Sequence, residues 1–212
     1  MATNIVDRDF VRLMRAPGLT VVLLGFALAT TQAAAAPLDT TGATQCEVRG
    51  YVKDRDPKGT NVRNAPRADA PVIGRLAPMV NISADEWTGV EFDIVGSKGG
   101  WLLITNPTPA DGMKLDAEHA AGGRGWIWGG LVGTQLATVP LRSGPRRDTP
   151  AVARFKGDTW GPDSVAVSAI HGCEGKYVEV TATPIGGKTL RGWSFAPCSA
   201  QLTTCDGWRM ED

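Results

Sequence analysis

His171 and Cys173, two residues apart, are the side chains of this chain best suited to covalent chemistry. A cysteine nucleophile needs a thiolate beside a histidine base, and residues two apart on a strand share a face. The other histidine, His119, stands far from both, and no third residue that would orient the base is evident. The pattern leaves a cysteine-dependent peptidase as an alternative and favours a protein that is not an enzyme.

The cysteines are better explained as disulfide partners than as nucleophiles or metal ligands. There are four, at Cys46, Cys173, Cys198 and Cys205, and they allow three pairings among which the sequence does not choose. We expect one bond within the second half of the chain, with Cys46 tying the amino end to the rest. Because no Cys-x-x-Cys occurs and the histidines stand apart, we expect neither a metal nor another cofactor.

Aromatic residues are the main candidates for noncovalent recognition. The chain has seven tryptophans, and Trp128 follows Trp126 by two residues, which predicts that both point to one side of a strand. Together with Trp101 and Tyr51 they would line one aromatic groove suited to extended peptides or sugars. The alternative is that these rings serve ordinary core packing.

The segment around Arg63 contains two polar candidates for ligand contact. Pro66 cannot donate to a sheet ladder and therefore ends the strand before it. Asn61 can bond locally to backbone and hold a tight turn. Arg63 is interpreted as a structural clamp of its loop, bridging to an acidic partner such as Asp69, with direct ligand contact as the alternative.

The amino end has the pattern of a secretory signal peptide. Arg12 and Arg15 precede an apolar run over 19–29, and small residues follow as far as Ala36. The apolar run falls short of the roughly 20 residues that a membrane-spanning helix needs, so cleavage after Ala35 is favoured over a membrane anchor. Acidic residues before Arg12 fit a signal poorly, which leaves Met14 as an alternative start. We therefore expect a periplasmic or secreted protein without a stable membrane span.

A stretch of the chain occurs twice, and the repeat divides the sequence. Residues 61–76 realign without a gap on 140–155. Identical positions are Arg63/Arg142, Pro66/Pro145, Arg67/Arg146, Asp69/Asp148, Pro71/Pro150 and Arg75/Arg154. Further matches follow in the same order, 99–104 with 175–180 and 124–127 with 191–194, the first copy carrying an insertion around 106–123. Repeats of this kind predict two copies of one small unit, each with its own core.

The elements that position these residues are predicted to be short strands. Runs such as 90–95, 165–170 and 177–181 alternate apolar with polar residues, and glycines and prolines separate them. Outside the signal, only 112–121 has the composition of a helical turn or two. We expect an all-β protein with a signal peptide at 1–35, a disordered leader at 36–45, a first domain at 46–137 and a second, divergent domain at 138–212.

Several motifs of the first copy resemble those of the bacterial Src-homology-3-like domain. They are Gly-x-Asn-Val-Arg-x-x-Pro at 59–66, then Val-Ile-Gly-x-Leu, then Gly-Gly-Trp, then Gly-Trp-Ile. The second copy lacks the Gly and Asn that precede the arginine, while its later blocks fit. The resemblance implies two tandem, small, partly open β-barrels behind the signal, and exported members of the family commonly bind cell-wall peptides or polysaccharide.

These observations favour a non-catalytic, exported binding module. Its expected partner is peptidoglycan or an envelope protein; a structural or regulatory envelope protein is a further alternative. The formal net charge of the chain is zero, which argues against a nucleic-acid partner. If the first copy presents the groove, replacing Trp128 should weaken binding far more than replacing Trp160.

Overall fold

Strands form nearly all the regular structure of this protein, so the predicted all-β class is confirmed. The computed structural model describes residues 37–84, 86–109, 123–138, 140–154 and 165–201. Within those ranges the single helical element is η1, a 3-10 turn at Gly129–Leu131. No helix in the described ranges is long and apolar enough to cross a membrane. The predicted signal peptide and the helical turn expected at 112–121 lie outside the described residues.

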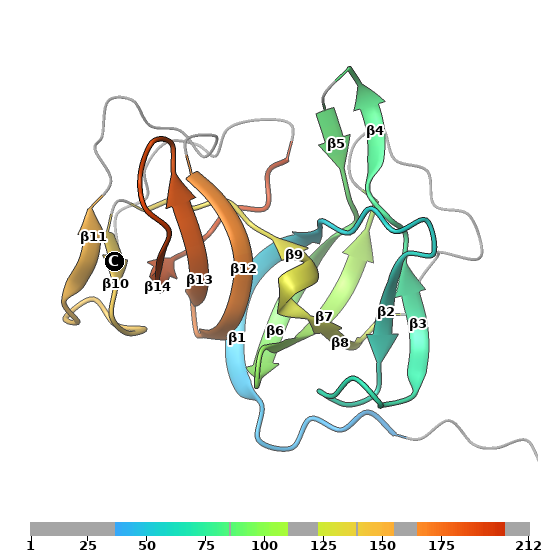
Figure 1. The fold of residues 1–212 in the computed structure, drawn as a ribbon. Helices are drawn as coiled ribbons and strands as arrows, with labels where there is room; N and C mark the ends of the chain where they lie inside the picture. Colours follow the sequence, from blue (N-terminus) through green and yellow to red (C-terminus); the bar gives the residue numbers. More distant parts are fainter. Residues whose placement is uncertain (1–36, 85, 110–122, 139, 155–164, 202–212) are drawn as a thin grey trace, which may run out of the picture. The chain divides into compact units, whose positions relative to one another are not determined.

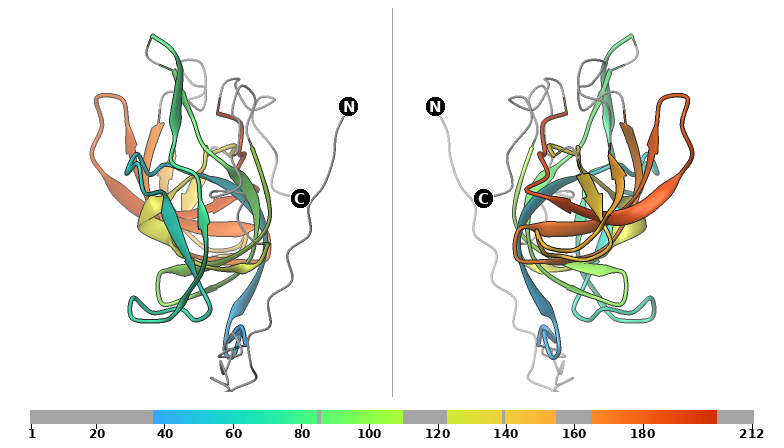
Figure 2. Two further views of the ribbon diagram at one scale, coloured as in Figure 1. Left: turned by 90° about the vertical axis from the view of Figure 1, so that its right-hand side faces the viewer. Right: turned by 90° about the vertical axis from the view of Figure 1, so that its left-hand side faces the viewer.

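The first half of the chain builds a seven-stranded antiparallel sheet in the order β3-β2-β8-β7-β6-β1-β9 (Figure 1). Its strands are β1 (Thr44–Val52), β2 (Thr60–Arg63), β3 (Val72–Leu76), β6 (Glu91–Lys98), β7 (Trp101–Thr108), β8 (Gly125–Trp128) and β9 (Val132–Gly133). A separate hairpin, β4 (Val80–Ser83) with β5 (Glu86–Thr88), projects beyond the larger sheets (Figure 1 and Figure 2).

The second half repeats this strand order. Its five-stranded sheet runs β11-β10-β14-β13-β12, which matches β3-β2-β8-β7-β6 strand for strand. The strands are β10 (Pro140–Arg142), β11 (Ala151–Arg154), β12 (Val165–Glu174), β13 (Tyr177–Pro184) and β14 (Leu190–Phe195). Among the described residues no strand pairing closes either sheet. The expected barrels are therefore two open sheets, of seven and five strands.

The repeated arginines perform the same structural task in both halves. Arg63 donates from Nη1 to the carbonyl of Ala70 at 2.6 Å, and Arg142 donates from Nη1 to the carbonyl of Thr149 at 2.8 Å. Each acceptor lies seven residues beyond its arginine, on the turn between the two strands of a hairpin. The strand register shifts at the arginine in both hairpins. Conserved spacing in the repeat thus encodes one turn, clamped by one side chain.

The two halves share one hydrophobic core instead of the separate cores expected. Phe92 and Ile94 of β6 and Val178 and Val180 of β13 belong to a single cluster of buried apolar residues. The disulfide Cys46–Cys173 joins β1 to β12 within that cluster. From Ala35 to Asp212 the chain is one compact unit, so the division at 137/138 stays a prediction. Small units gain stability by pooling apolar burial in this way.

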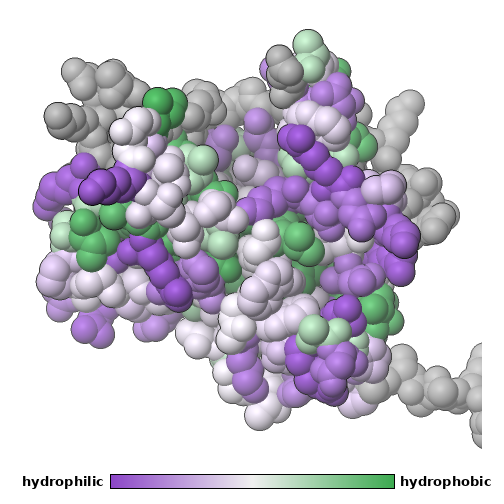
Figure 3. All heavy atoms as spheres, in the orientation of Figure 1, coloured by the Kyte–Doolittle hydropathy of each residue, from purple (hydrophilic) through white to green (hydrophobic). Residues whose placement is uncertain are grey.

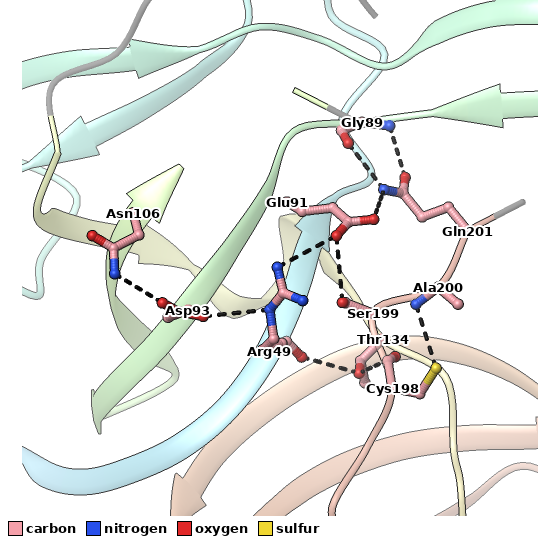
Figure 4. Close-up of polar contacts among 10 residues, drawn as sticks. All are labelled: Arg49, Gly89, Glu91, Asp93, Asn106, Thr134, Cys198, Ser199, Ala200 and Gln201. Carbon is pink, nitrogen blue, oxygen red and sulfur yellow. Dashed lines mark hydrogen bonds and ion pairs between the residues drawn. The ribbon is translucent and has the colours of Figure 1, made fainter. Parts of the chain in front are cut away.

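Polar side chains fasten the carboxyl end of the second half to the first sheet (Figure 4). Gln201 bonds to both backbone groups of Gly89, at 2.7 Å and 3.0 Å, and to Glu91 at 3.2 Å. Arg49 lies between Glu91, at 3.5 Å, and Asp93, at 3.3 Å. These contacts connect β1 and β6 with the segment that follows β14.

Residues 37–43 lie on the first sheet, which differs from the disordered leader expected there. Asp39 donates its N–H to the carbonyl of Asn64 at 2.8 Å. Its carboxylate accepts the N–H of Thr41 at 2.9 Å, and Lys98 donates to the carbonyl of Thr41 at 2.7 Å. The hydrogen bonds to Thr41, followed by the Lys98 charge, lower the pKa of Asp39. Small polar residues predicted disorder, but backbone hydrogen bonds hold the segment without apolar side chains.

Candidate functional site

Trp101 and Trp128 form an edge-to-face pair that is open to solvent, here called the aromatic platform. They face each other across β7 and β8, with ring centroids 5.6 Å apart and planes inclined by 64°. This edge-to-face geometry is the one that aromatic quadrupoles favour. Trp101 is half-buried, whereas 47% of Trp128 is exposed. An indole this accessible is available to a partner.

Glycines on both sides of Trp128 fix the orientation of its ring. A Cβ at Gly100, which has φ of 84°, would lie 2.7 Å from the Trp128 ring. A Cβ at Gly130 would lie 2.5 Å from the indole nitrogen. The N–H of Gly129 also donates to the carbonyl of Gly100 at 2.9 Å. The indole therefore rests on bare backbone and is held in place before any ligand arrives.

Trp126 does not belong to this platform, although the sequence placed it in the same groove. Ile127 belongs to the hydrophobic core, so Trp126 and Trp128 point to the opposite face of β8. Trp126 is nevertheless 0% exposed. Its indole N–H donates to the carbonyl of Asp39 at 2.7 Å, which shows that residues 37–43 cover this part of the face. The leader removes Trp126 from solvent.

Asn61 and Arg63 lie in β2, where Arg63 pairs with the buried Trp126 of β8. The Nη1 of Arg63 is used for the clamp to Ala70, the interpretation favoured from the sequence, and Asp69 pairs instead with Arg67 at 2.9 Å. Asn61 is half-buried opposite Arg75 of β3. Its Oδ1 is buried without a hydrogen-bond partner among the described residues. Neither side chain adjoins the platform through a strand pairing.

Tyr51 lies at the other end of the first sheet from the platform. It pairs with Glu91 and with Gly133, where an added Cβ would lie 2.3 Å from the tyrosine ring. Burial, followed by the charge of Glu91, raises the pKa of its phenol. Trp101 instead pairs with Lys98, at the opposite end of β6 from Glu91. Of the six predicted ligand-binding residues, the structure brings Trp101 and Trp128 together in the platform, and it pairs Arg63 with the buried Trp126.

The cysteines are oxidised in the described part of the chain. Cys46 is bonded to Cys173, and Cys198 is also disulfide-bonded. Cys46 thus ties the amino end to the second half, as expected; Cys205 lies outside the described residues. Cys173 carries no thiol, so it offers no nucleophile beside His171. That histidine bonds through Nε2 to the Thr181 hydroxyl at 2.7 Å.

The sequence did contain a signal for the platform that the aromatic spacing alone missed. Glycines flank both rings, in Gly99-Gly100-Trp101 and Trp128-Gly129-Gly130. Paired glycines beside an aromatic residue indicate a ring that packs on backbone.

A further aromatic contact, between the guanidinium of Arg55 and the ring of Trp87 at 4.1 Å, lies at the β4–β5 hairpin. His119 and Trp160 lie outside the described residues.

The face of the molecule seen in the orientation of Figure 1 is mixed in character. Figure 3 shows hydrophobic residues in small groups among hydrophilic ones on one face of the molecule. Other large exposed apolar side chains are Val72, Ile73, Val152 and Ile185. Isolated apolar residues of this kind are normal on soluble domains.

Comparison with known proteins finds no matching family model, no similar curated protein and no similar solved structure.

Proposed function

We propose that this chain is an exported, non-catalytic module that binds peptidoglycan through the aromatic platform. The observation that carries the proposal is the solvent-open, edge-to-face pair of Trp101 and Trp128. Tryptophan dominates recognition sites because it offers a large apolar face at low conformational cost. Here Gly100 and Gly130, which lie against the indole of Trp128, have already fixed its orientation, so a peptide or sugar meets a preorganised surface.

The duplicated strand order supports the proposal that both halves are divergent Src-homology-3-like domains. The five shared strands, their order and the arginine clamp recur in each half. Such small β domains are used repeatedly as binding scaffolds, so fold alone assigns no ligand. At the matching positions of the second half, Tyr177 of β13 and Phe195 of β14 form an equivalent aromatic pair, with ring centroids 5.1 Å apart. Phe195 is only 8% exposed, whereas 47% of Trp128 is exposed, so the second pair offers little ring surface to a partner. We assign binding to the first half and a supporting role to the second.

The oxidised cysteines support export. Disulfides persist in the periplasm and outside the cell, and are rare in the reducing cytosol. The amino-terminal signal pattern agrees with that location. A periplasmic or secreted protein meets peptidoglycan directly, which makes the wall the first ligand to test.

Co-sedimentation with purified peptidoglycan tests the proposal. We expect the mature protein to pellet with the wall and Trp128→Ala to bind about 30-fold more weakly, the loss typical of an interface tryptophan. Trp87→Ala is the matched control, since Trp87 is a partly exposed tryptophan on the separate hairpin. If Trp128→Ala and Trp87→Ala were retained on peptidoglycan equally well, the aromatic platform would not be the binding surface. Failure of the wild-type protein to pellet would reject wall binding and leave an envelope protein as the partner to seek.

A further inference from the structure

A second candidate site lies where the two halves meet, in what we call the junction groove. This depression of about 800 Å³ is lined by Glu47 and Arg49 of β1, Glu91 of β6, Lys176, and residues 195–200 after β14. Its volume falls in the range of small-ligand sites. Figure 4 shows part of its wall, where Arg49, Glu91 and Ser199 converge. The platform residues do not line it, so it is a separate surface.

The walls of the junction groove are held rigidly by cross-links between the halves. The disulfide at Cys46 adjoins Glu47, whose N–H donates to the carbonyl of Gly175 at 2.7 Å. On the facing wall, Cys198 exchanges two backbone hydrogen bonds with Gln135, both at 2.8 to 2.9 Å. A groove whose walls are fixed loses little entropy when a ligand enters.

The backbone of Ala196 is another mark of a shaped site. Its φ of 42° is in the left-handed region, which residues with a Cβ seldom adopt. The conformation lets its N–H donate to the carbonyl of Lys176 at 2.7 Å and turns the chain along the groove. Backbone of this uncommon kind is concentrated at binding and catalytic sites.

The junction groove is lined by charged side chains of both signs, and two of them have no partner among the described residues. Arg49 and Glu91 are paired with each other. The side chains of Glu47 and Lys176 are exposed, and neither has an ion pair or hydrogen bond to any described residue. They line the same groove. A ligand with a single sign of charge would be attracted to one and repelled by the other, whereas a ligand with both signs satisfies both.

We propose that the junction groove binds a short zwitterionic peptide. Its ammonium group pairs with the Glu47 carboxylate and its carboxylate pairs with the Lys176 ammonium. Phe195, which is 8% exposed, also lines the groove. This site is independent of the aromatic platform.

Titration of the mature protein with tri-alanine, followed by amide NMR shifts, tests this site. The free tripeptide carries both charges; acetyl-tri-alanine-amide carries neither. We expect the free peptide to bind with a Kd of about 1 mM and to shift amides near Glu47 and Lys176, while the capped peptide leaves them unchanged. Equal binding of both peptides, or no shifts at these amides, would overturn the proposal.

Charge-neutral variants identify the two groups. Glu47→Gln and Lys176→Gln are each expected to weaken tri-alanine binding about threefold to fivefold, the range of an exposed ion pair. Glu174→Gln and Lys188→Gln are the controls, because both are exposed charges of the second half that do not line the groove. Unpartnered surface charges are not needed for folding, so native spectra are expected throughout. Unchanged affinity in both test variants would overturn the assignment. Trp128→Ala is expected to leave this titration unaltered, which separates it from wall binding.

Discussion

Two glycines at matching repeat positions provide a sharp test of the duplicated architecture. Gly125 opens β8 beside β2, and a Cβ there would lie 2.4 Å from Val62 Cγ1 and 3.0 Å from the carbonyl oxygen of Arg63. Gly192 lies in β14 beside β10, and a Cβ there would lie 2.7 Å from Leu141 Cγ and 2.8 Å from the carbonyl oxygen of Arg142. In each half, therefore, the strand that carries the glycine (β8 or β14) lies so close to the clamped strand (β2 or β10) that no room is left for the methyl group of an alanine.

The magnitude follows from which atoms must move. Val62 and Leu141 are both 0% exposed and cannot swing into solvent. The carbonyl oxygens are strand backbone, so the neighbouring strand itself must shift. Overpacking of this kind costs about 1–3 kcal/mol. We expect Gly125→Ala and Gly192→Ala each to lower the free energy of unfolding by that amount.

Urea denaturation followed by circular dichroism measures the effect. Gly172→Ala is the matched control, since a Cβ at Gly172 of β12 would meet only the Ser97 hydroxyl, at 3.4 Å, an ordinary contact. We expect this control to change stability by less than about 0.5 kcal/mol or to stabilise slightly. If all three alanine variants unfold at the same urea concentration, the close approach in both halves is refuted.

Three further predictions concern stability. Arg63→Met and Arg142→Met, which remove equivalent clamps, should each cost about 1.5–3 kcal/mol in urea denaturation because a carbonyl loses a charged donor; a loss in only one variant would show that the halves do not use the clamp alike. Replacing both Cys46 and Cys173 by alanine opens a link between residues 127 apart and should cost about 4–5 kcal/mol on loop entropy, whereas a drop under about 1 kcal/mol would contradict a structural role. Burial, followed by the nearby charge of Arg191, lowers the pKa of His171 in the folded protein. The stability that the neutral imidazole contributes is therefore present above the unfolded pKa near 6.5 and is lost as the pH falls below 6.5. His171→Gln should flatten that part of the stability–pH curve, and an unchanged curve would contradict this prediction.

Short-range patterns carried most of what the sequence could predict about the fold. The alternation of apolar and polar residues predicted the strands, and the repeated arginine marked the clamped hairpin in each half. Both features depend on residues close together in the sequence: each arginine bonds to a carbonyl only seven residues further on. The attachment of Cys46 to the second half also agrees with expectation. The single shared core did not follow from the repeat, because duplicated units can pack either apart or together without a change in local pattern.

The candidate site was harder to predict because burial depends on distant segments. Trp126 and Trp128 share a strand face, yet a backbone carbonyl of Asp39 covers only the first. Nothing in the residues around Trp126 encodes that contact, which joins positions 87 residues apart. Likewise the clamp of Arg63 uses a backbone carbonyl, an acceptor that has no signature in the side-chain sequence.

Trp101 and Trp128 form the proposed recognition surface, and indole N–H NMR tests this role most directly. Soluble muropeptides would be titrated into the mature protein while its indole signals are followed. We predict that the signals of Trp101 and Trp128 shift together in a saturable way, while that of Trp126, buried and bonded to Asp39, stays in place. Unmoved signals from the platform at saturating ligand, or shifts confined to other tryptophans, would contradict the account.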